Sequence, residues 1–484
     1  MCCFCIDQHS VVEQMKGSGI LTRSKVDFFL EFGSRVTGIG HVLAMMSPWK
    51  DPGYLKRIWC VFEFFSANQY GCKVTIVMPP AEKTALERDL LGDEEGEGID
   101  TLYEALARTK VQDAKASVAS DGVAILNQVK NDPGYEILNQ RVNELLRKWV
   151  RTAVLAVGER QRDSANALAY ADICTKVGQV LSSNGEYDIA MLQFGRALAI
   201  REALLSGDHP DVAESFYMAG SARQDMGDYE GALLYYKNAS FILENAGGVS
   251  YSSCAATYNS IGSCLLEKGD LDGALAEHRK ALAVYKEALG NNHPDLASAL
   301  TNIGTVLHAK GEFVDALLEH KKGLNIRLSA LGTSHPDTSS SYYHIATVFR
   351  DMGHLDSALL AYRRALEIQE RVLGRDHPET SYTYNNIGMA LQQQGKHEAA
   401  LEEYRKGLAI REATLGDHPS TANSHVNIGA ILLEKKDDQA ALAEFQKALS
   451  IRKITLGIDH PDTVQTEKSI AELLFKKVEN EPKK

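Results

Sequence analysis

Three asparagines, Asn302, Asn386 and Asn427, occupy one equivalent position in a repeated sequence pattern. An asparagine amide offers two hydrogen-bond donors and an acceptor oxygen. A row of such amides can satisfy the backbone of an extended peptide without contacting its side chains. The sequence therefore predicts a peptide-binding surface wherever the repeat places these amides side by side. The alternative is that the asparagines cap or bond neighbouring helices and bind nothing.

Six histidines precede prolines and could, by residue type, bind metal. They are His209, His293, His335, His377, His418 and His460. One histidine per repeat leaves neighbouring imidazoles at least a helix spacing of about 8 to 10 Å apart. Each ligand of a zinc ion must come within about 2 Å of the metal. We therefore predict that these histidines cap helices, and we expect neither a metal site nor a cofactor.

The His-Pro dipeptides recur at steps of 84, 42, 42, 41 and 42 residues. A second series of markers keeps the same step, because a glycine followed five residues later by an alanine recurs along the chain. These glycines are Gly185, Gly227, Gly269, Gly311, Gly353 and Gly395. In the seventh copy Lys436 stands in place of the glycine. Residues 167–478 thus contain seven copies of one unit of about 42 residues.

Each copy has the apolar spacing of two helices. In the fourth copy Leu300, Ile303 and Leu307 follow a helical period, and a second apolar row follows Gly311. A glycine at the turn can adopt a positive φ where the first helix ends. A small residue within each first helix lets the two helices approach closely. These small residues are Gly178, Gly220, Gly262, Gly304, Ala346, Gly388 and Gly429. One hairpin cannot bury its own apolar face, so stacked copies must share a core.

These markers resemble the tetratricopeptide repeat. The period and the segment Leu-Gly-x-x-His-Pro-Asp, at 289–295 and 331–337, resemble the kinesin light chain branch of that family, as do 385–388 and 404–412. The resemblance implies a right-handed α-solenoid of about seven helical hairpins plus a closing helix from Pro461. It also implies that the first helix of each repeat lines a concave groove.

In such a solenoid, residues of the first helices that are not packed into the core project into the groove. Besides the three asparagines, these residues are Thr301, Thr305, His308, Tyr343, His344, Arg350, Asn385 and Gln392. In the resembled families an asparagine at the shared position binds peptide backbone, which implies that role for Asn302, Asn386 and Asn427. The sequence departs from a carboxylate clamp, because Thr301, Asn385 and Val426 stand where such a clamp needs Lys and Arg.

Residues 1–150 do not join the repeat. Buried strands are predicted at 41–46 and 73–78, a helix with an apolar stripe at 54–70, and a closing helix at 135–150. Alternating strands and helices predict an α/β layer with parallel strands.

Within this region, Ser47-Pro48 followed by Trp59-Cys60-x-x-Glu63 resembles the signature of Toll/interleukin-1 receptor (TIR)-like domains. The segment 5–8, Cys-Ile-Asp-Gln, resembles the one that precedes it in that family. In TIR enzymes that cleave NAD this glutamate is catalytic, which would give Glu63 that role. Such a carboxylate could stabilise oxocarbenium-like charge as the glycosidic bond breaks. The chain begins at what resembles the second strand, so we expect the domain to lack its first strand and helix.

The composition excludes several classes of protein. With 44% hydrophobic and 24% charged residues the chain has the balance of a folded protein. Its net charge of −12, without a basic tract, argues against nucleic acid or an anionic membrane as the main partner. No apolar run is long enough to span a membrane and no secretory signal is readable. Its 8 cysteines have no framework spacing, so we expect reduced thiols and a cytoplasmic location.

The sequence thus predicts a mostly helical protein. Its expected parts are an incomplete TIR-like α/β domain at 1–150, a connecting helix or linker at 151–166, the solenoid at 167–478 and a disordered tail at 479–484. The expected function is a scaffold that binds an extended peptide of a partner protein, and not an enzyme. One alternative is an NAD-cleaving enzyme regulated by the repeats. Another is a cargo adaptor for a kinesin motor, whose heavy chain would be the partner, although no sustained heptad region precedes residue 160.

Overall fold

A computed structural model of the chain describes residues 41–45, 73–77, 79–91, 135–162, 166–246 and 251–480. The chain divides into two compact units, 1–228 and 229–484. The division falls within residues 167–478, for which the sequence predicts one solenoid.

Two parallel strands belong to the first unit. Strand β1 (His41–Met45) pairs with β2 (Lys73–Val77), and the register places His41 opposite Lys73. The predicted positions and the parallel pairing are confirmed. Helix α4 (Pro80–Leu91) follows β2 and was not predicted; it begins at a proline, which suits the first helical position because it needs no backbone N–H there.

The predicted helix at 54–70, with Glu63, lies outside the described residues, as do the segment 5–8 and Ser47-Pro48.

A single helix, α7 (Tyr135–Gln161), runs through the predicted boundary at 150–151. Its buried residues Val150, Val154 and Val157 follow helical spacing and are 1 to 2% exposed. The helix contacts α8, and Arg151 forms an ion pair of 3.1 Å with Glu186 just before α9. The segment predicted as a connecting helix or linker is therefore largely the packed second half of α7.

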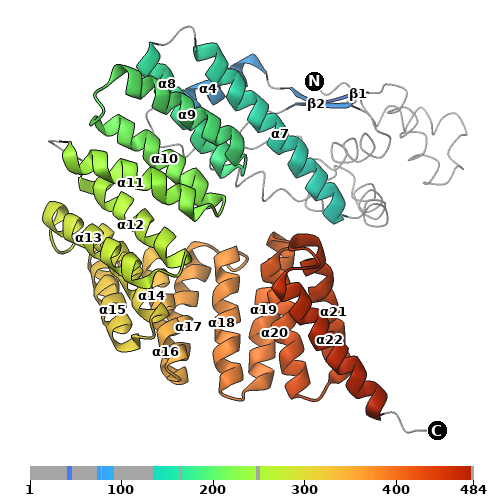
Figure 1. Cartoon of the computed structure of the whole chain (residues 1–484). Helices are drawn as coiled ribbons and strands as arrows, with labels where there is room; N and C mark the ends of the chain where they lie inside the picture. Colours follow the sequence, from blue (N-terminus) through green and yellow to red (C-terminus); the bar gives the residue numbers. More distant parts are fainter. Residues whose placement is uncertain are drawn as a thin grey trace, which may run out of the picture. The chain divides into compact units, whose positions relative to one another are not determined.

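The repeat array begins in the first unit with α8 (Ala167–Ser183), α9 (Tyr187–Leu204) and α10 (Pro210–Asp225). The second unit contains α11 (Tyr229–Asn245), α12 (Tyr251–Glu267), α13 (Leu271–Leu289), α14 (Pro294–Ala309), α15 (Phe313–Ala330), α16 (Pro336–Asp351), α17 (Leu355–Val372), α18 (Pro378–Gln393), α19 (His397–Thr414), α20 (Pro419–Glu434), α21 (Asp438–Thr455) and α22 (Pro461–Asn480). Within this unit α12 to α21 form five hairpins, each beside the next (Figure 1). They share one core cluster that extends from Ala274 to Leu473. The closing helix and the predicted hairpins formed by α8–α9 and by α12 to α21 are thus confirmed, and α22 extends past the start of the predicted tail.

The His-Pro histidines cap first helices, as predicted. In each case the imidazole Nδ1 accepts a hydrogen bond from the backbone N–H two residues later, at 3.1 to 3.3 Å. The bond satisfies one of the free N–H groups at the start of the helix. Among the residues that the structure describes, no cluster of His, Cys, Asp or Glu could hold a metal ion.

The turn glycines adopt the predicted backbone conformation. All six have φ between 73° and 82°. Lys436, which replaces the glycine in the last hairpin, has φ 64°. A side chain at such a φ costs about 1 kcal/mol, so the hairpin geometry is retained there despite local strain.

In five of the seven repeats the small residue of the first helix lies against a ring of the second helix. A Cβ added at Gly304 would lie 2.6 Å from Cε1 of His320, and one at Gly388 would lie 2.7 Å from Cδ1 of Tyr404. Contacts this short do not occur between real side chains, so the ring fills the space that glycine leaves. The same pairing joins Gly178 to Phe194, Gly262 to His278 and Gly429 to Phe445. The predicted close approach of the two helices is confirmed.

A buried polar contact joins successive hairpins and was not predicted. Arg327, near the end of α15, donates from Nη1 to Ser341 Oγ of α16 at 2.7 Å. The same contact joins Arg201 to Ser215, Arg411 to Ser424 and Arg452 to Thr466 at 2.6 to 2.8 Å. Burial lowers the pKa of Arg327, and its guanidinium donates a hydrogen bond to the hydroxyl of Ser341. An arginine followed by Ser or Thr after 13 or 14 residues was the signal in the sequence.

In the described part of the chain, no helix is both long enough and apolar enough to cross a membrane.

Candidate functional site

The predicted groove residues lie on α14, α16, α18 and α20, the first helices of four consecutive hairpins in the second unit. Helix α14 contacts α16, and α16 contacts α18. The histidine cap fixes where each helix starts, and the ring under its small residue fixes its rotation. These two constraints bring equivalent positions of neighbouring first helices together.

On α14 the three predicted residues Thr301, Asn302 and Thr305 differ in their surroundings. Thr301 is 8% exposed, and its Oγ1 donates to Ala297 O at 2.8 Å. Contrary to the sequence expectation, Thr301 therefore lies in the helix interface and not on an open surface. Thr305 is half-buried and donates to the backbone of Thr301 at 3.0 Å. The half-buried amide of Asn302 has no hydrogen-bond partner among the described residues.

A chain of polar contacts crosses α14, α16 and α18. His308 Nε2 lies 2.8 Å from Asp351 Oδ2. Arg350 donates from Nε to Asp351 Oδ1 at 2.8 Å and from Nη1 to Asn386 Oδ1 at 2.5 Å. Asn386 Nδ2 donates in turn to the hydroxyl of Tyr343 at 2.8 Å. The structure therefore brings together four of the predicted residues, namely His308, Arg350, Asn386 and Tyr343. It adds Asp351, which the sequence analysis did not select.

The contacts continue from α18 to α20. Asn427 Nδ2 donates to Asn385 Oδ1 at 3.0 Å. Gln392 donates to Glu434 at 2.8 Å and accepts from the hydroxyl of Tyr404 at 3.0 Å. Two of the three equivalent asparagines thus bond to a neighbouring first helix, as the alternative interpretation of these residues supposes.

We call these contacting polar side chains of α14, α16, α18 and α20 the polar row. Opposite charges meet at its centre. Burial favours the neutral form of Arg350, but its hydrogen bond to Asp351 and its electrostatic attraction to Asp351, Tyr362 and Tyr343 together outweigh that effect and raise the pKa of Arg350. Burial also opposes ionisation of Asp351, yet Arg350 and His308 together lower the pKa of Asp351. Burial raises the pKa of the Tyr343 hydroxyl. At neutral pH the centre therefore holds an arginine, a carboxylate and a phenol that remains protonated.

His344, at the position equivalent to Asn302, belongs to a separate cluster. Its ring stacks on that of His320 with centroids 5.3 Å apart and an interplanar angle of 12°. Burial lowers the pKa of His344 to about 4 and that of His320 to about 3, with a further contribution from the neighbouring cations. Both rings are therefore neutral at physiological pH, and His344 presents an imidazole where the other positions present amides.

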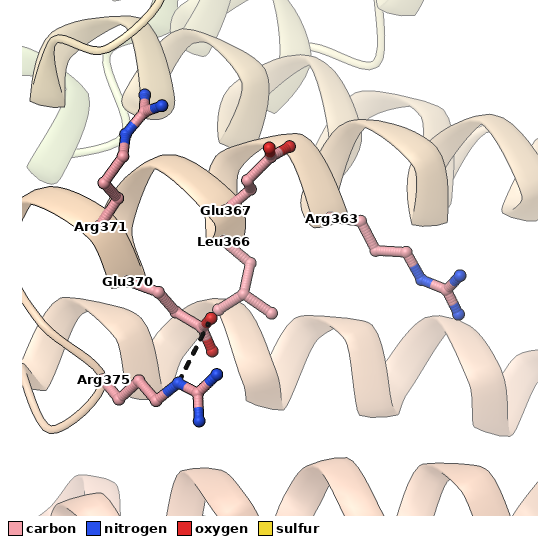
Figure 2. Close-up of a pocket in the computed structure, with 6 residues that line it drawn as sticks. All are labelled: Arg363, Leu366, Glu367, Glu370, Arg371 and Arg375. Carbon is pink, nitrogen blue, oxygen red and sulfur yellow. Dashed lines mark ion pairs between the residues drawn. The ribbon is translucent and has the colours of Figure 1, made fainter.

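Two cavities in the described residues lie on the second helices, away from the predicted groove residues. One, of about 490 Å³, is lined by residues of α17 and by Arg375, which pairs with Glu370 at 3.7 Å (Figure 2). The other, of about 800 Å³, lies between α13 and α15 over α14. None of the predicted groove residues lines either cavity.

The fold defines an α-solenoid built from stacked helical hairpins. The model of the tetratricopeptide repeat family matches residues 166–244, 253–329, 319–371, 337–413 and 383–454, which is more than half of the chain. The chain belongs to the tetratricopeptide repeat family. No match was found among curated proteins.

Several solved structures are similar to this chain. BtubC (BKLC) from P. vanneervenii is 20% identical over 48% of this chain and 94% of its own, with a TM-score of 0.43. A Podosopora anserina protein with nearly identical TPR-like repeats, described as a candidate kinesin light chain, is 19% identical over 43% and 98%, with a TM-score of 0.37. A STAND signal-transduction ATPase with a tetratricopeptide repeat sensor, from Pyrococcus horikoshii, is 14% identical over 94% and 81%, with a TM-score of 0.49.

Replacing His320 by tyrosine, as at Tyr362 and Tyr404, is expected to reduce the acid sensitivity of the protein. An unfolded histidine titrates near pH 6.5, whereas folded His320 has a pKa of about 3, so the unfolded chain binds more protons as the pH falls. The stability linked to His320 is therefore complete above about pH 6.5 and is lost progressively towards pH 3. Between pH 7 and 5 the wild type should lose about 2 kcal/mol more unfolding free energy than His320→Tyr in urea titrations.

The groups facing His320 are His344, His308 and Arg327, none of which offers a negative charge to a protonated ring. The new hydroxyl can bond Thr305, as Tyr362 bonds Thr347 at 3.0 Å. The exposed His354, changed to glutamine, is the control for removing a histidine outside this cluster. Equal losses in His320→Tyr and wild type would contradict the assignment of acid sensitivity to this ring.

Proposed function

We propose that the chain is a protein-interaction scaffold that binds an extended peptide segment of a partner along α14, α16, α18 and α20, in the manner of kinesin light chains. The observation that carries the proposal is the row of polar side chains across these consecutive first helices. A repeat scaffold offers such a row at regular spacing. Cys174, Cys254 and Cys264 are free, buried thiols, which agrees with the cytoplasmic location that we propose.

The chemistry of this row suits a peptide backbone. Asn302 has an amide ready to bond a guest, whereas Asn386 uses both its donors and its acceptor within the chain, since it also donates to Tyr382 O at 2.9 Å. A backbone amide carries one donor and one acceptor, so it can replace such internal bonds one for one. Each exchanged bond contributes about 1 kcal/mol or less. Affinity then comes from several such bonds together with contacts to Tyr343 and Arg350.

Removing the three amides is expected to abolish most peptide binding. Peptides would be selected from a random display library against the full chain, and their affinities measured by fluorescence anisotropy. Asn302→Ala/Asn386→Ala/Asn427→Ala should weaken binding of the selected peptides at least about tenfold, because each truncation removes backbone bonds.

A matched control is Asn238→Ala/Asn292→Ala, which changes two exposed asparagines away from the first-helix row. It should bind the peptides as the wild type does. Unchanged affinity in the triple variant, with its helical circular dichroism intact, would remove these asparagines from the proposed site.

The kinesin light chain manner of binding rests on the period of 42 and on Leu-Gly-x-x-His-Pro-Asp at 289–295 and 331–337. Linkage to a kinesin motor is a further possibility within this proposal. Co-purification of a kinesin heavy chain with the tagged protein would distinguish a motor adaptor from a scaffold that has no motor.

The parallel pairing of β1 and β2 favours a second candidate, a TIR-like NAD-cleaving activity of residues 1–150. A parallel pair requires a crossover connection, usually a helix, and the predicted helix with Glu63 lies between these strands in the sequence. Purified wild-type chain incubated with NAD should then release nicotinamide, and Glu63→Ala should lose most of that rate. No release by the wild type, or equal release by the variant, would refute the activity.

A further inference from the structure

The two cavities, one at α17 and one between α13 and α15, share lining positions of the repeat but differ in the residues at those positions. We call each cavity a slot. In the cavity of α17 the lining residues Arg363, Leu366, Glu370 and Arg375 (Figure 2) lie 84 residues after four residues that line the cavity of α13. Those four are Arg279, Leu282, Lys286 and Asn291. The cavity at α17 measures about 490 Å³ and the one at α13 about 800 Å³. Comparing residues at equivalent repeat positions therefore shows which side chains the larger slot lacks.

A tyrosine reaches the slot at α17, where its hydroxyl meets the lining residue Glu370. The hydroxyl of Tyr384 donates to Glu370 at 2.5 Å, and Lys406 Nζ lies 5.9 Å from the centre of its ring. Burial and Glu370 raise the pKa of Tyr384 to about 12, so the hydroxyl remains a donor.

The third hairpin holds a tyrosine in the same way. Tyr258, which lies 126 residues before Tyr384, donates to Glu244 at 2.7 Å and has Lys280 Nζ 5.4 Å from its ring centre. In both hairpins the ring thus lies between a carboxylate at its hydroxyl and a cation over its face.

The slot over α14 has neither a ring at the position of Tyr384 nor a carboxylate at the position of Glu370. Leu300 stands at the tyrosine position, 84 residues before Tyr384, and Lys286 stands at the position of Glu370. Lys322 keeps the position of Lys406 and lines the slot together with Leu300 and Lys286. The exchange of a tyrosine for a leucine therefore leaves space, and the exchange of a glutamate for a lysine reverses the charge at the end of that space.

The charges around the slot orient a guest. Lys286 is exposed and forms no ion pair within the described ranges of the chain, while Lys322 is paired with Glu319 at 2.7 Å. A lysine ammonium can only donate hydrogen bonds, so the group that meets Lys286 must be an acceptor. Arg279 adds positive charge to the α13 wall, whereas the α15 wall carries Glu312, Asp315 and Glu319 beside Lys322 and is acidic on balance. An anionic end is therefore directed to α13.

We propose that this slot binds a small aromatic carboxylate. The ring lies over Leu300 in the space that a tyrosine occupies elsewhere, Lys322 covers its face, and the carboxylate bonds Lys286. The floor of Leu296, Leu300 and Ile303 is apolar, and the volume of about 800 Å³ falls in the range of small-molecule sites. The site uses none of the predicted groove residues, so it stands independently of peptide binding along the first helices.

The direct test is titration of the full chain with 4-ethylbenzoate, followed by ligand-observed NMR and calorimetry. Saturable binding to one site per chain is expected. Neutral 4-ethylbenzamide should bind about tenfold more weakly because it cannot pair with Lys286, and cyclohexanecarboxylate likewise because it has no π face for Lys322. Absence of saturable binding up to about 10 mM, or equal binding of the three compounds, would overturn the proposal.

A second experiment exchanges residues between the two slots and tests whether the ligand binds in the slot over α14. Lys286→Glu/Leu300→Tyr installs the pair that Glu370 and Tyr384 form, and it should abolish binding while leaving the thermal midpoint at or above that of wild type. The reciprocal Glu370→Lys/Tyr384→Leu should raise the stoichiometry to two. Lys286→Ala changes only an exposed side chain and should weaken 4-ethylbenzoate about tenfold even if the reciprocal variant does not fold. Undiminished binding by Lys286→Glu/Leu300→Tyr would contradict the assignment.

Discussion

The close approach of the paired helices, where a small residue meets a ring, is the contact on which the rest of the array depends. At Gly304 and Gly388 there is no room for a methyl group. Because the ring of the second helix occupies that space, it sets both the separation of the helices and the rotation of the first helix. That rotation decides which residues of α14, α16 and α18 face their neighbours, and hence which side chains form the polar row.

A second contact sets how one hairpin follows another. Arg327 reaches Ser341 of the next first helix, and in the fifth hairpin Gln369 accepts from Thr383 at 2.7 Å instead. Where Tyr285 stands at the arginine position, Ala299 stands at the serine position, so the guanidinium and its hydroxyl acceptor are absent together. Unpaired buried polar groups cost about 1 to 3 kcal/mol. Where Leu243 replaces the arginine, Thr257 avoids that cost by donating to Ser253 O of its own helix at 2.7 Å. The spacing of hairpins is thus specified separately from their internal geometry.

Much of the fold could be predicted from the sequence because its signals repeat. Helix starts at His-Pro, turns at glycine and small residues such as Gly388 each recur at one step, and the structure confirms all three. The positions and contacts of individual side chains were harder to predict. Thr301 shares its surface position with Tyr343 in the sequence pattern, yet its short side chain bonds its own helix and lies near Arg327. The open slot over Leu300 could not be predicted from apolar periodicity, because leucine and tyrosine satisfy that periodicity equally and differ only in volume.

The central claim is tested most directly by the unfolding free energy of Gly388→Val, measured in urea beside Gly195→Val. Alanine, at Ala346, is the largest residue found at the small position in the seven hairpins, so valine exceeds what the ring contact can accommodate. The account predicts a loss of about 3 kcal/mol for Gly388→Val. It predicts little change for Gly195→Val, because no atom lies within 4 Å of a Cβ added there. Equal stability of the two variants would contradict the claim that the ring contact sets the geometry of the hairpins.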